Sequence, residues 1–169
     1  TPAGNYTQQV AGITGSLAGN YLLATNGNTF GTLTVQPATL TYTIANATST
    51  YGNLPSLGNV TFTGLYATDT VTPSVGISQG NASVNITTTT PAGNYTQQVT
   101  GISGNLSSNY QLASVGNTLG TLNVQPATLT YAVANTTSTY GTTPSTGNMT
   151  LSGIVAADIG NVTGTVSTL

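Results

Sequence analysis

The segment Thr-Leu-Thr-Tyr-Thr-Ile-Ala at 39–45 carries the clearest structural signal in this sequence. Leu40, Tyr42 and Ile44 alternate with threonines, so the apolar side chains fall on one face of a β-strand and the hydroxyls on the other. Similar alternation recurs at 60–65, 83–87 and 122–124, whereas no segment has a helical period. The chain is therefore predicted to be all-β, with antiparallel sheets that have one buried and one solvated face.

The chain is organised as a tandem repeat with a period of 89 residues. TPAGNYTQQV occupies 1–10 and returns unchanged at 90–99. Aligned at this offset without gaps, residues 1–80 and 90–169 are identical at 48 of 80 positions, and the match fades after Asp69 and Asp158. Such a period exceeds the solenoid units of about 20–50 residues and suits a small β-domain. We predict the last part of a first repeat at 1–36, a complete repeat at 37–125, and the first part of a following repeat at 126–169.

The complete repeat is predicted to hold seven strands, separated by turn signals such as Tyr51-Gly52 and Gly58-Asn59. The strands are placed at 39–46, 58–65, 71–78, 82–89, 94–102, 109–115 and 119–125. Seven short strands at this spacing fit an immunoglobulin-like sandwich, although the sequence lacks the Cys and Trp of a true immunoglobulin core. The predicted fold class is all-β, with tandem immunoglobulin-like antiparallel β-sandwich domains arranged end to end.

The composition excludes most catalytic and metal sites. The 169 residues include no Lys, Arg, His or Cys and only two acidic residues, so 1% of the chain is charged and the net charge is −2. An average soluble domain is about 25% charged. Ser-His-Asp and Cys-His sites, Schiff bases, Walker A motifs and Cys/His zinc sites all need residues that are missing. We expect no enzyme activity, no catalytic or metal-binding residues and no cofactor.

The same composition limits the partners of the chain. Without Lys or Arg it has no cationic surface to meet nucleic acid or anionic lipid. No run approaches the 18 apolar residues of a membrane span, so no membrane insertion is expected within the segment. The chain starts at Thr1 without a charged or apolar leader, and a signal peptide is expected to be absent or already removed. A net charge this small promotes association between copies.

Six motifs resemble the MBG and YDG repeats of large bacterial surface adhesins. They are GTLTVQPATLTY at 31–42, STYG at 49–52, GLYATD at 64–69, PAGNYT at 91–96, SNY at 108–110 and GTLNVQ at 120–125. The resemblance covers both offset copies and implies a secreted, extracellular β-rich stalk at the cell surface, without catalytic residues. That family usually has an acidic residue after the Tyr-Gly pair. Here Asn53 and Thr142 follow it, which removes a candidate cation ligand.

Few polar side chains remain as candidates for a site. Asp69 and Asp158 occupy equivalent positions in successive repeats, too far apart for an acid dyad and too few for a calcium site, so a loop role is favoured. Tyr51 and Tyr140 are interpreted as turn or interdomain packing residues, and Tyr42 as a core residue. Ten N-x-S/T sequons are candidate glycosylation sites, conditional on a glycosylating host, although composition alone predicts about five. They lie at Asn5, Asn46, Asn59, Asn81, Asn85, Asn94, Asn105, Asn135, Asn148 and Asn161.

Two functions are compatible with this sequence. The first is a non-catalytic structural segment of an adhesin stalk or extracellular fibre, whose partners are neighbouring repeats or copies of the same chain. The chain is then either an excerpt of a longer array or a subunit that associates head to tail, and the sequence leaves both open. The second is a module that binds glycans or a host surface, for which Gln97-Gln98, retained from Gln8-Gln9, is the candidate surface.

Overall fold

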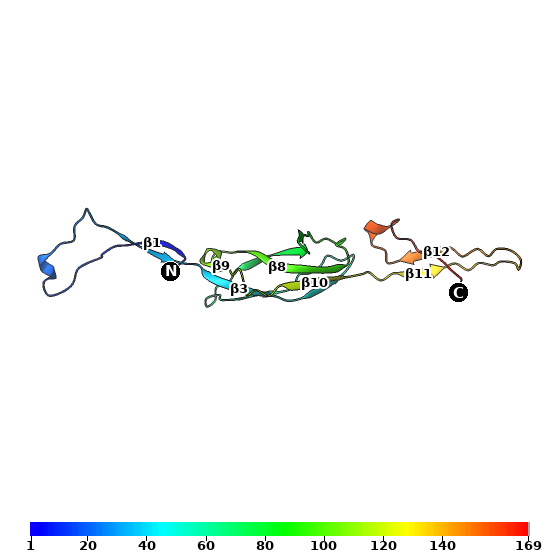
Figure 1. Ribbon diagram of the computed structural model, residues 1–169, viewed down its shortest axis with the longest axis horizontal. Coiled ribbons are helices and arrows are strands. Elements are labelled where there is room, and N and C mark those ends of the chain that lie inside the picture. Colours follow the sequence, from blue (N-terminus) through cyan, green and yellow to red (C-terminus); the bar gives the residue numbers. More distant parts are fainter. Residues whose placement is uncertain (169) are drawn as a thin grey trace. The chain divides into compact units, whose positions relative to one another are not determined.

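The computed structural model describes residues 1–168, and the regular secondary structure of these residues is almost entirely β-strand, with no α-helix (Figure 1). The predicted all-β class is thus confirmed. Three single-turn 3₁₀ helices are present: η1 (Ala18–Asn20), η2 (Ser107–Asn109) and η3 (Ala156–Asp158). The strands are β1 (Gly4–Gln8), β2 (Gly31–Val35), β3 (Ala38–Ile44), β4 (Ala47–Thr50), β5 (Val60–Thr63), β6 (Thr72–Gln79), β7 (Ala82–Ser83), β8 (Gly93–Ser103), β9 (Tyr110–Leu112), β10 (Gly120–Gln125), β11 (Thr130–Val133) and β12 (Met149–Ser152).

The strands form four sheets, in the orders β1-β2, β4-β10-β8-β6-β7, β11-β12 and β5-β3-β9. The 89-residue period extends to the strand register. In the β1-β2 pair Gly4 lies opposite Val35 and Gln8 opposite Gly31, and in the β8-β10 pair the equivalent Gly93 and Gln97 lie opposite Val124 and Gly120. Equal sequences at offset positions therefore make the same antiparallel ladder.

The residues divide into two compact units, each containing parts of two sequence repeats. The first unit comprises Thr1–Tyr42, Thr61–Ser74 and Thr100–Asn117, and the second comprises Thr43–Val60, Val75–Val99 and the chain from Thr118 onward. Strands β3, β5, β6 and β8 contribute residues to both units. The repeat boundaries at 36/37 and 125/126 stay a prediction.

The second unit has a core built on alternate residues of β6, β8 and β10. Ile77, Tyr95, Leu122 and Val124 form a buried cluster. Ala47, Tyr51, Leu57, Val75, Val84 and Ile86 pack against it as partly buried residues. Burial of one large apolar side chain contributes about 1.5–3 kcal/mol, so these few side chains provide much of the stabilisation.

In the first unit, β3 shows why the alternation at 39–45 was informative. Leu40 and Tyr42 are buried on one side of the strand, whereas Thr39 is exposed. Ala38 to Leu40 pair in parallel with Tyr110 to Leu112 of β9, and the Ala113 amide donates to the Leu40 carbonyl at 2.7 Å. The prediction that Tyr42 is a core residue is confirmed.

The strand predictions hold in six of the seven places, with two corrections. The strand expected at 82–89 ends at Ser83, and Val84 and Ile86 pack against the core from irregular backbone instead. Strand β4 was not predicted because its sequence, Ala-Thr-Ser-Thr, lacks apolar alternation. It pairs in parallel with β10, as β3 does with β9, so the sheets are not purely antiparallel as expected.

Candidate functional site at the repeat junctions

Each unit contains a cavity at a point where successive sequence repeats meet, and these two cavities are lined in part by equivalent residues. The cavity of the second unit has a volume of about 410 Å³ and that of the first about 490 Å³. At the 89-residue offset, five lining positions coincide. These pairs are Pro2 and Pro91, Ala3 and Ala92, Ala38 and Ala127, Tyr66 and Val155, and Asp69 and Asp158. We call these two places the repeat junctions.

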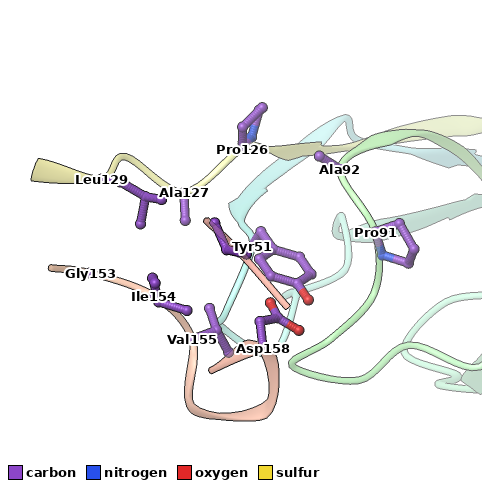
Figure 2. Close-up of a pocket in the computed structure, with 11 residues that line it drawn as sticks. Tyr51, Pro91, Ala92, Pro126, Ala127, Leu129, Gly153, Ile154, Val155 and Asp158 are labelled. Atoms are coloured by element: carbon purple, nitrogen blue, oxygen red, sulfur yellow. The ribbon is translucent and has the colours of Figure 1, made fainter. Parts of the chain in front are cut away.

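At the junction in the second unit, Tyr51 of the complete repeat meets Asp158 of the following repeat. Figure 2 shows the Tyr51 hydroxyl directed at the Asp158 carboxylate. The Tyr51 amide donates to the Gln125 carbonyl at 2.8 Å, which ties this turn to the end of β10. The 3₁₀ turn of η3 presents the carboxylate, with the Asp158 amide donating to the Val155 carbonyl at 2.8 Å.

Gly52 allows the two repeats to approach closely at this junction. Its backbone φ of +96° lies in a region that residues other than glycine rarely adopt. A Cβ at this position would lie 2.7 Å from Cγ2 of Val155, closer than van der Waals contact permits. The Tyr51-Gly52 pair thus combines a donor for Asp158 with a surface that fits against Val155.

At the junction in the first unit, Asp69 accepts a hydrogen bond from a tyrosine of its own repeat. The Tyr110 hydroxyl donates to Oδ2 of Asp69 at 2.6 Å and accepts from the Tyr66 amide at 3.1 Å. The Asp69 amide donates to the Tyr66 carbonyl at 2.9 Å, which closes the turn. A short phenol–carboxylate bond of this kind is charge-assisted and stronger than a bond between neutral groups.

The two carboxylates change the acidity of their tyrosines. The hydrogen bond to Asp69 raises the pKa of Tyr110 above its ordinary value of 10.0; the bond from the Tyr66 amide opposes this change, while desolvation and the Asp69 charge add to it. The hydrogen bond to Asp158, with desolvation and the Asp158 charge, likewise raises the pKa of Tyr51. A raised pKa in the folded state means that folding favours the protonated phenol.

Alkaline pH is therefore expected to weaken both junctions. Because the folded-state pKa values of Tyr51 and Tyr110 lie above the unfolded value of about 10, their stabilisation is present below pH 10 and is lost as the pH rises through the folded values. The urea concentration at the unfolding midpoint should decrease as the pH is raised from 8 to 11.5. The variant with Tyr51→Phe and Tyr110→Phe should have a lower midpoint at pH 8 and a shallower fall, whereas Tyr140→Phe should follow the parent. Parallel curves for the parent and the double variant would contradict this assignment.

Neither junction gathers further carboxylates or other metal-binding side chains. Among residues 1–168, no group of three or more His, Cys, Asp and Glu lies close enough to hold a metal ion. Asp69 and Asp158 lie in turns, as the loop interpretation predicted, but that interpretation missed their tyrosine partners. The available signal was the recurrence of Tyr51, Tyr110 and a single Asp at the same positions of an 89-residue repeat.

Gln97 lies in the core and not on a binding surface, which corrects the prediction for Gln97-Gln98. Its side chain is fully buried, whereas Gln98 is exposed. Oε1 accepts from the Gly58 amide at 2.8 Å, and Nε2 donates to the Ala45 carbonyl at 3.5 Å. A buried amide needs such partners, and here they connect β8 to the turns after β3 and before β5.

The asparagines of all ten sequons are exposed. Three of them also accept hydrogen bonds through Oδ1: Asn5 from Thr34, Asn46 from the Thr121 amide and Asn94 from Asn123. Exposure makes the ten positions accessible to a glycosylating enzyme, and glycosylation stays a prediction.

No family model, curated protein or solved structure matches this chain. Within residues 1–168, no helix has the length and apolar character needed to cross a membrane. Any functional assignment therefore depends on the repeats and their junctions.

Proposed function

We propose that the chain is a non-catalytic structural segment of tandem immunoglobulin-like β-sandwich repeats, belonging to a secreted cell-surface adhesin stalk or extracellular fibre. The observation that carries this proposal is that the same kind of junction occurs twice in the chain. The cavities around Asp69 and Asp158 are lined by residues at equivalent positions, although they lie in different units. A junction that recurs with the sequence period is what a uniform array of repeats requires.

The surface chemistry supports the same proposal. The chain has no basic side chain and its net charge is −2, so neighbouring repeats repel one another weakly and salt has few ion pairs to screen. Trypsin-like proteases, which cleave after Lys and Arg, find no cleavage site in this sequence. Both properties suit a stalk or fibre that is exposed outside the cell.

Lengthened chains test this function. One, two and four extra copies of residues 37–125 are inserted after residue 125, and the maximum dimension of each chain is measured by small-angle scattering at low concentration. An array joined through uniform junctions should gain a constant increment in this dimension for each added copy. Growth close to the cube root of chain mass would indicate that the repeats collapse on one another, and would contradict the proposal.

The alternative function, a module that binds glycans or a host surface, has less support from the structure than from the sequence alone. It depended on the Gln97-Gln98 pair, and the Gln97 side chain is enclosed by its bonds to Gly58 and Ala45. Binding to several glycans on an array, lost on substitution of exposed tyrosines, would revive this alternative.

A further inference from the structure

The loop between β1 and β2 contains the only Asn-Gly pair of this sequence. Asn26 is followed by Gly27, whereas every other asparagine precedes a residue that has a side chain. An Asn-Gly pair can react within itself, because no side chain hinders the glycine nitrogen as it approaches the amide carbon of the asparagine. The complete repeat has Val115-Gly116 at the equivalent position, so the two copies differ in this chemistry.

A side-chain hydrogen bond holds this loop in a bend. Nδ2 of Asn28 donates to the Ala24 carbonyl at 2.6 Å, and residues 25–27 form a bend between these two groups. The complete repeat makes the same bond, with Nδ2 of Asn117 donating to the Ala113 carbonyl at 2.7 Å. The two copies thus share this bend, but only the first has an asparagine before its glycine.

The reacting groups of Asn26 and Gly27 are free of other contacts. Both residues are exposed, and neither the Asn26 side chain nor the Gly27 amide makes a hydrogen bond to another residue of 1–168. Gly27 has a φ of +77°, and a Cβ built on it would have no atom within 4 Å. The Gly27 nitrogen is therefore open to solvent and to the side chain that precedes it.

The same bend faces solvent in the complete repeat. Val115 is 78% exposed there, and Gly116 is exposed with a φ of +80°. This position of the repeat stays uncovered although the core strands of the complete repeat are all present. The exposure of Asn26 therefore agrees with that of its counterpart and does not depend on strands that the first repeat lacks.

We propose that Asn26 is a site of spontaneous deamidation, in which its side-chain amide is converted to a carboxylate through a cyclic imide. Asparagine is among the thermolabile residues of proteins. This inference goes beyond the proposed function and is independent of it, because the reaction needs only water and the Asn26-Gly27 pair.

The reaction has two steps. The Gly27 nitrogen loses its proton to solvent base and bonds to Cγ of Asn26, while the Cγ–Nδ2 bond breaks and Nδ2 leaves as ammonia after taking a proton from solvent. Water then opens the resulting succinimide, either at Cγ, which gives aspartate, or at the main-chain carbonyl carbon, which gives an isoaspartyl linkage. The net reaction consumes one water and releases one ammonia, with no oxidation or reduction.

The product changes the charge of a nearly uncharged chain. An aspartyl carboxyl group in solvent is ionised at neutral pH, so each conversion adds one negative charge to a net charge of −2. The new charge lies outside the β1-β2 ladder, which ends where Gln8 pairs with Gly31. We expect the modified chain to keep its strands and to repel other copies more strongly.

The test follows the full, folded chain during incubation in mildly alkaline buffer. Chymotrypsin, which cleaves after large apolar residues, can cut after Leu23 and Phe30 and release a fragment that contains Asn26 and Asn28. Mass spectrometry of this fragment locates the new acid. Asn26 should be converted before every other asparagine, to both aspartate and isoaspartate, and more slowly in mildly acidic buffer because the attacking nitrogen must lose a proton.

Three variants test the role of the pair and of the bend. Asn26→Val, which copies the complete repeat, should remove the first product. Gly27→Ala should slow the reaction roughly tenfold, because a methyl group hinders the nitrogen and resists the left-handed backbone. Val115→Asn is the converse change and should create a second modified position, since Gly116 has the same backbone conformation as Gly27. Circular dichroism should be the same for the parent and all three variants.

The proposal would be overturned if Asn26 stays intact while other asparagines react, or if the parent and Gly27→Ala react at equal rates. A lack of reaction at position 115 in Val115→Asn would overturn the contribution of the shared bend. If Asn26 is converted as expected but the lengthened chains collapse, the proposed function fails and the deamidation site stands. If the lengthened chains extend by a constant increment but Asn26 stays intact, the reverse holds.

Discussion

Gly58→Ala should prevent the complete repeat from folding, with a loss of at least about 4 kcal/mol, the range reached only by severe steric or core defects. A Cβ at Gly58 would overlap the backbone carbonyl of Ala45, and Cγ2 of Ile44 lies 3.3 Å from the same point. Backbone atoms of a paired segment cannot move aside as a flexible side chain can. The Gly58 amide is also the donor to Gln97, so any shift of this turn breaks a buried hydrogen bond.

Urea unfolding followed by circular dichroism measures this effect. Gly101→Ala is the matched control, because a Cβ at Gly101 has open space and the φ of Gly101 is not positive. This control should change the unfolding free energy by less than about 1 kcal/mol. An unchanged midpoint for Gly58→Ala would show that the turn before β5 does not approach Ala45 as described.

Leu122→Ala should lower the unfolding free energy by about 3–4 kcal/mol, as expected for a leucine truncated in a closely packed core. The Leu122 side chain is fully buried in the cluster with Ile77, Tyr95 and Val124. Removing three carbon atoms there loses both their burial and the contacts of the atoms that surround the new cavity.

The repeat supplies a control for this substitution within the same chain. Leu33 occupies the equivalent position of β2 in the same local sequence, Gly-Thr-Leu, but is 44% exposed. Leu33→Ala should therefore cost less than about 1 kcal/mol when unfolding is measured at a concentration where the chain is monomeric. Equal losses for the two substitutions would contradict the difference in burial between β2 and β10.

Much of the strand pattern could be predicted from the sequence because it depends on local periodicity. At 39–45 and 122–124 the apolar residues alternate, and Leu40, Tyr42, Ile44, Leu122 and Val124 are buried as expected. Where alternation is absent or misleading the prediction was wrong. Strand β4 is polar and depends on its pairing with β10, and residues 84–87 alternate without forming a strand.

The junctions were only partly predictable. Tyr51 and the two aspartates could be selected because they are repeated and because the chain has no other carboxylates. The pairing of Tyr110 with Asp69 joins residues 41 positions apart, and nothing in the local sequence at either residue indicates that distance. Gln97 was chosen as part of a candidate binding surface because the Gln-Gln pair is retained between repeats, yet its side chain is buried and its bonds to Gly58 and Ala45 offset the cost of burial.

The identical segments TPAGNYTQQV at 1–10 and 90–99 show which features depend on local sequence and which depend on tertiary structure. Their local structure is the same: the Tyr6 hydroxyl donates to the Pro2 carbonyl at 2.7 Å, and the Tyr95 hydroxyl donates to the Pro91 carbonyl at 2.7 Å. Both segments also pair with their partner strand in the same register.

The burial of these two segments nevertheless differs. Tyr95, Gln97 and Val99 are buried, whereas Gln8 and Val10 are exposed. Sequence alone determined strand, turn and register, because these depend on neighbouring residues and on the adjacent strand. Tertiary structure decided which of two identical faces became core, because burial depends on the residues that cover a face, and these come from distant parts of the chain.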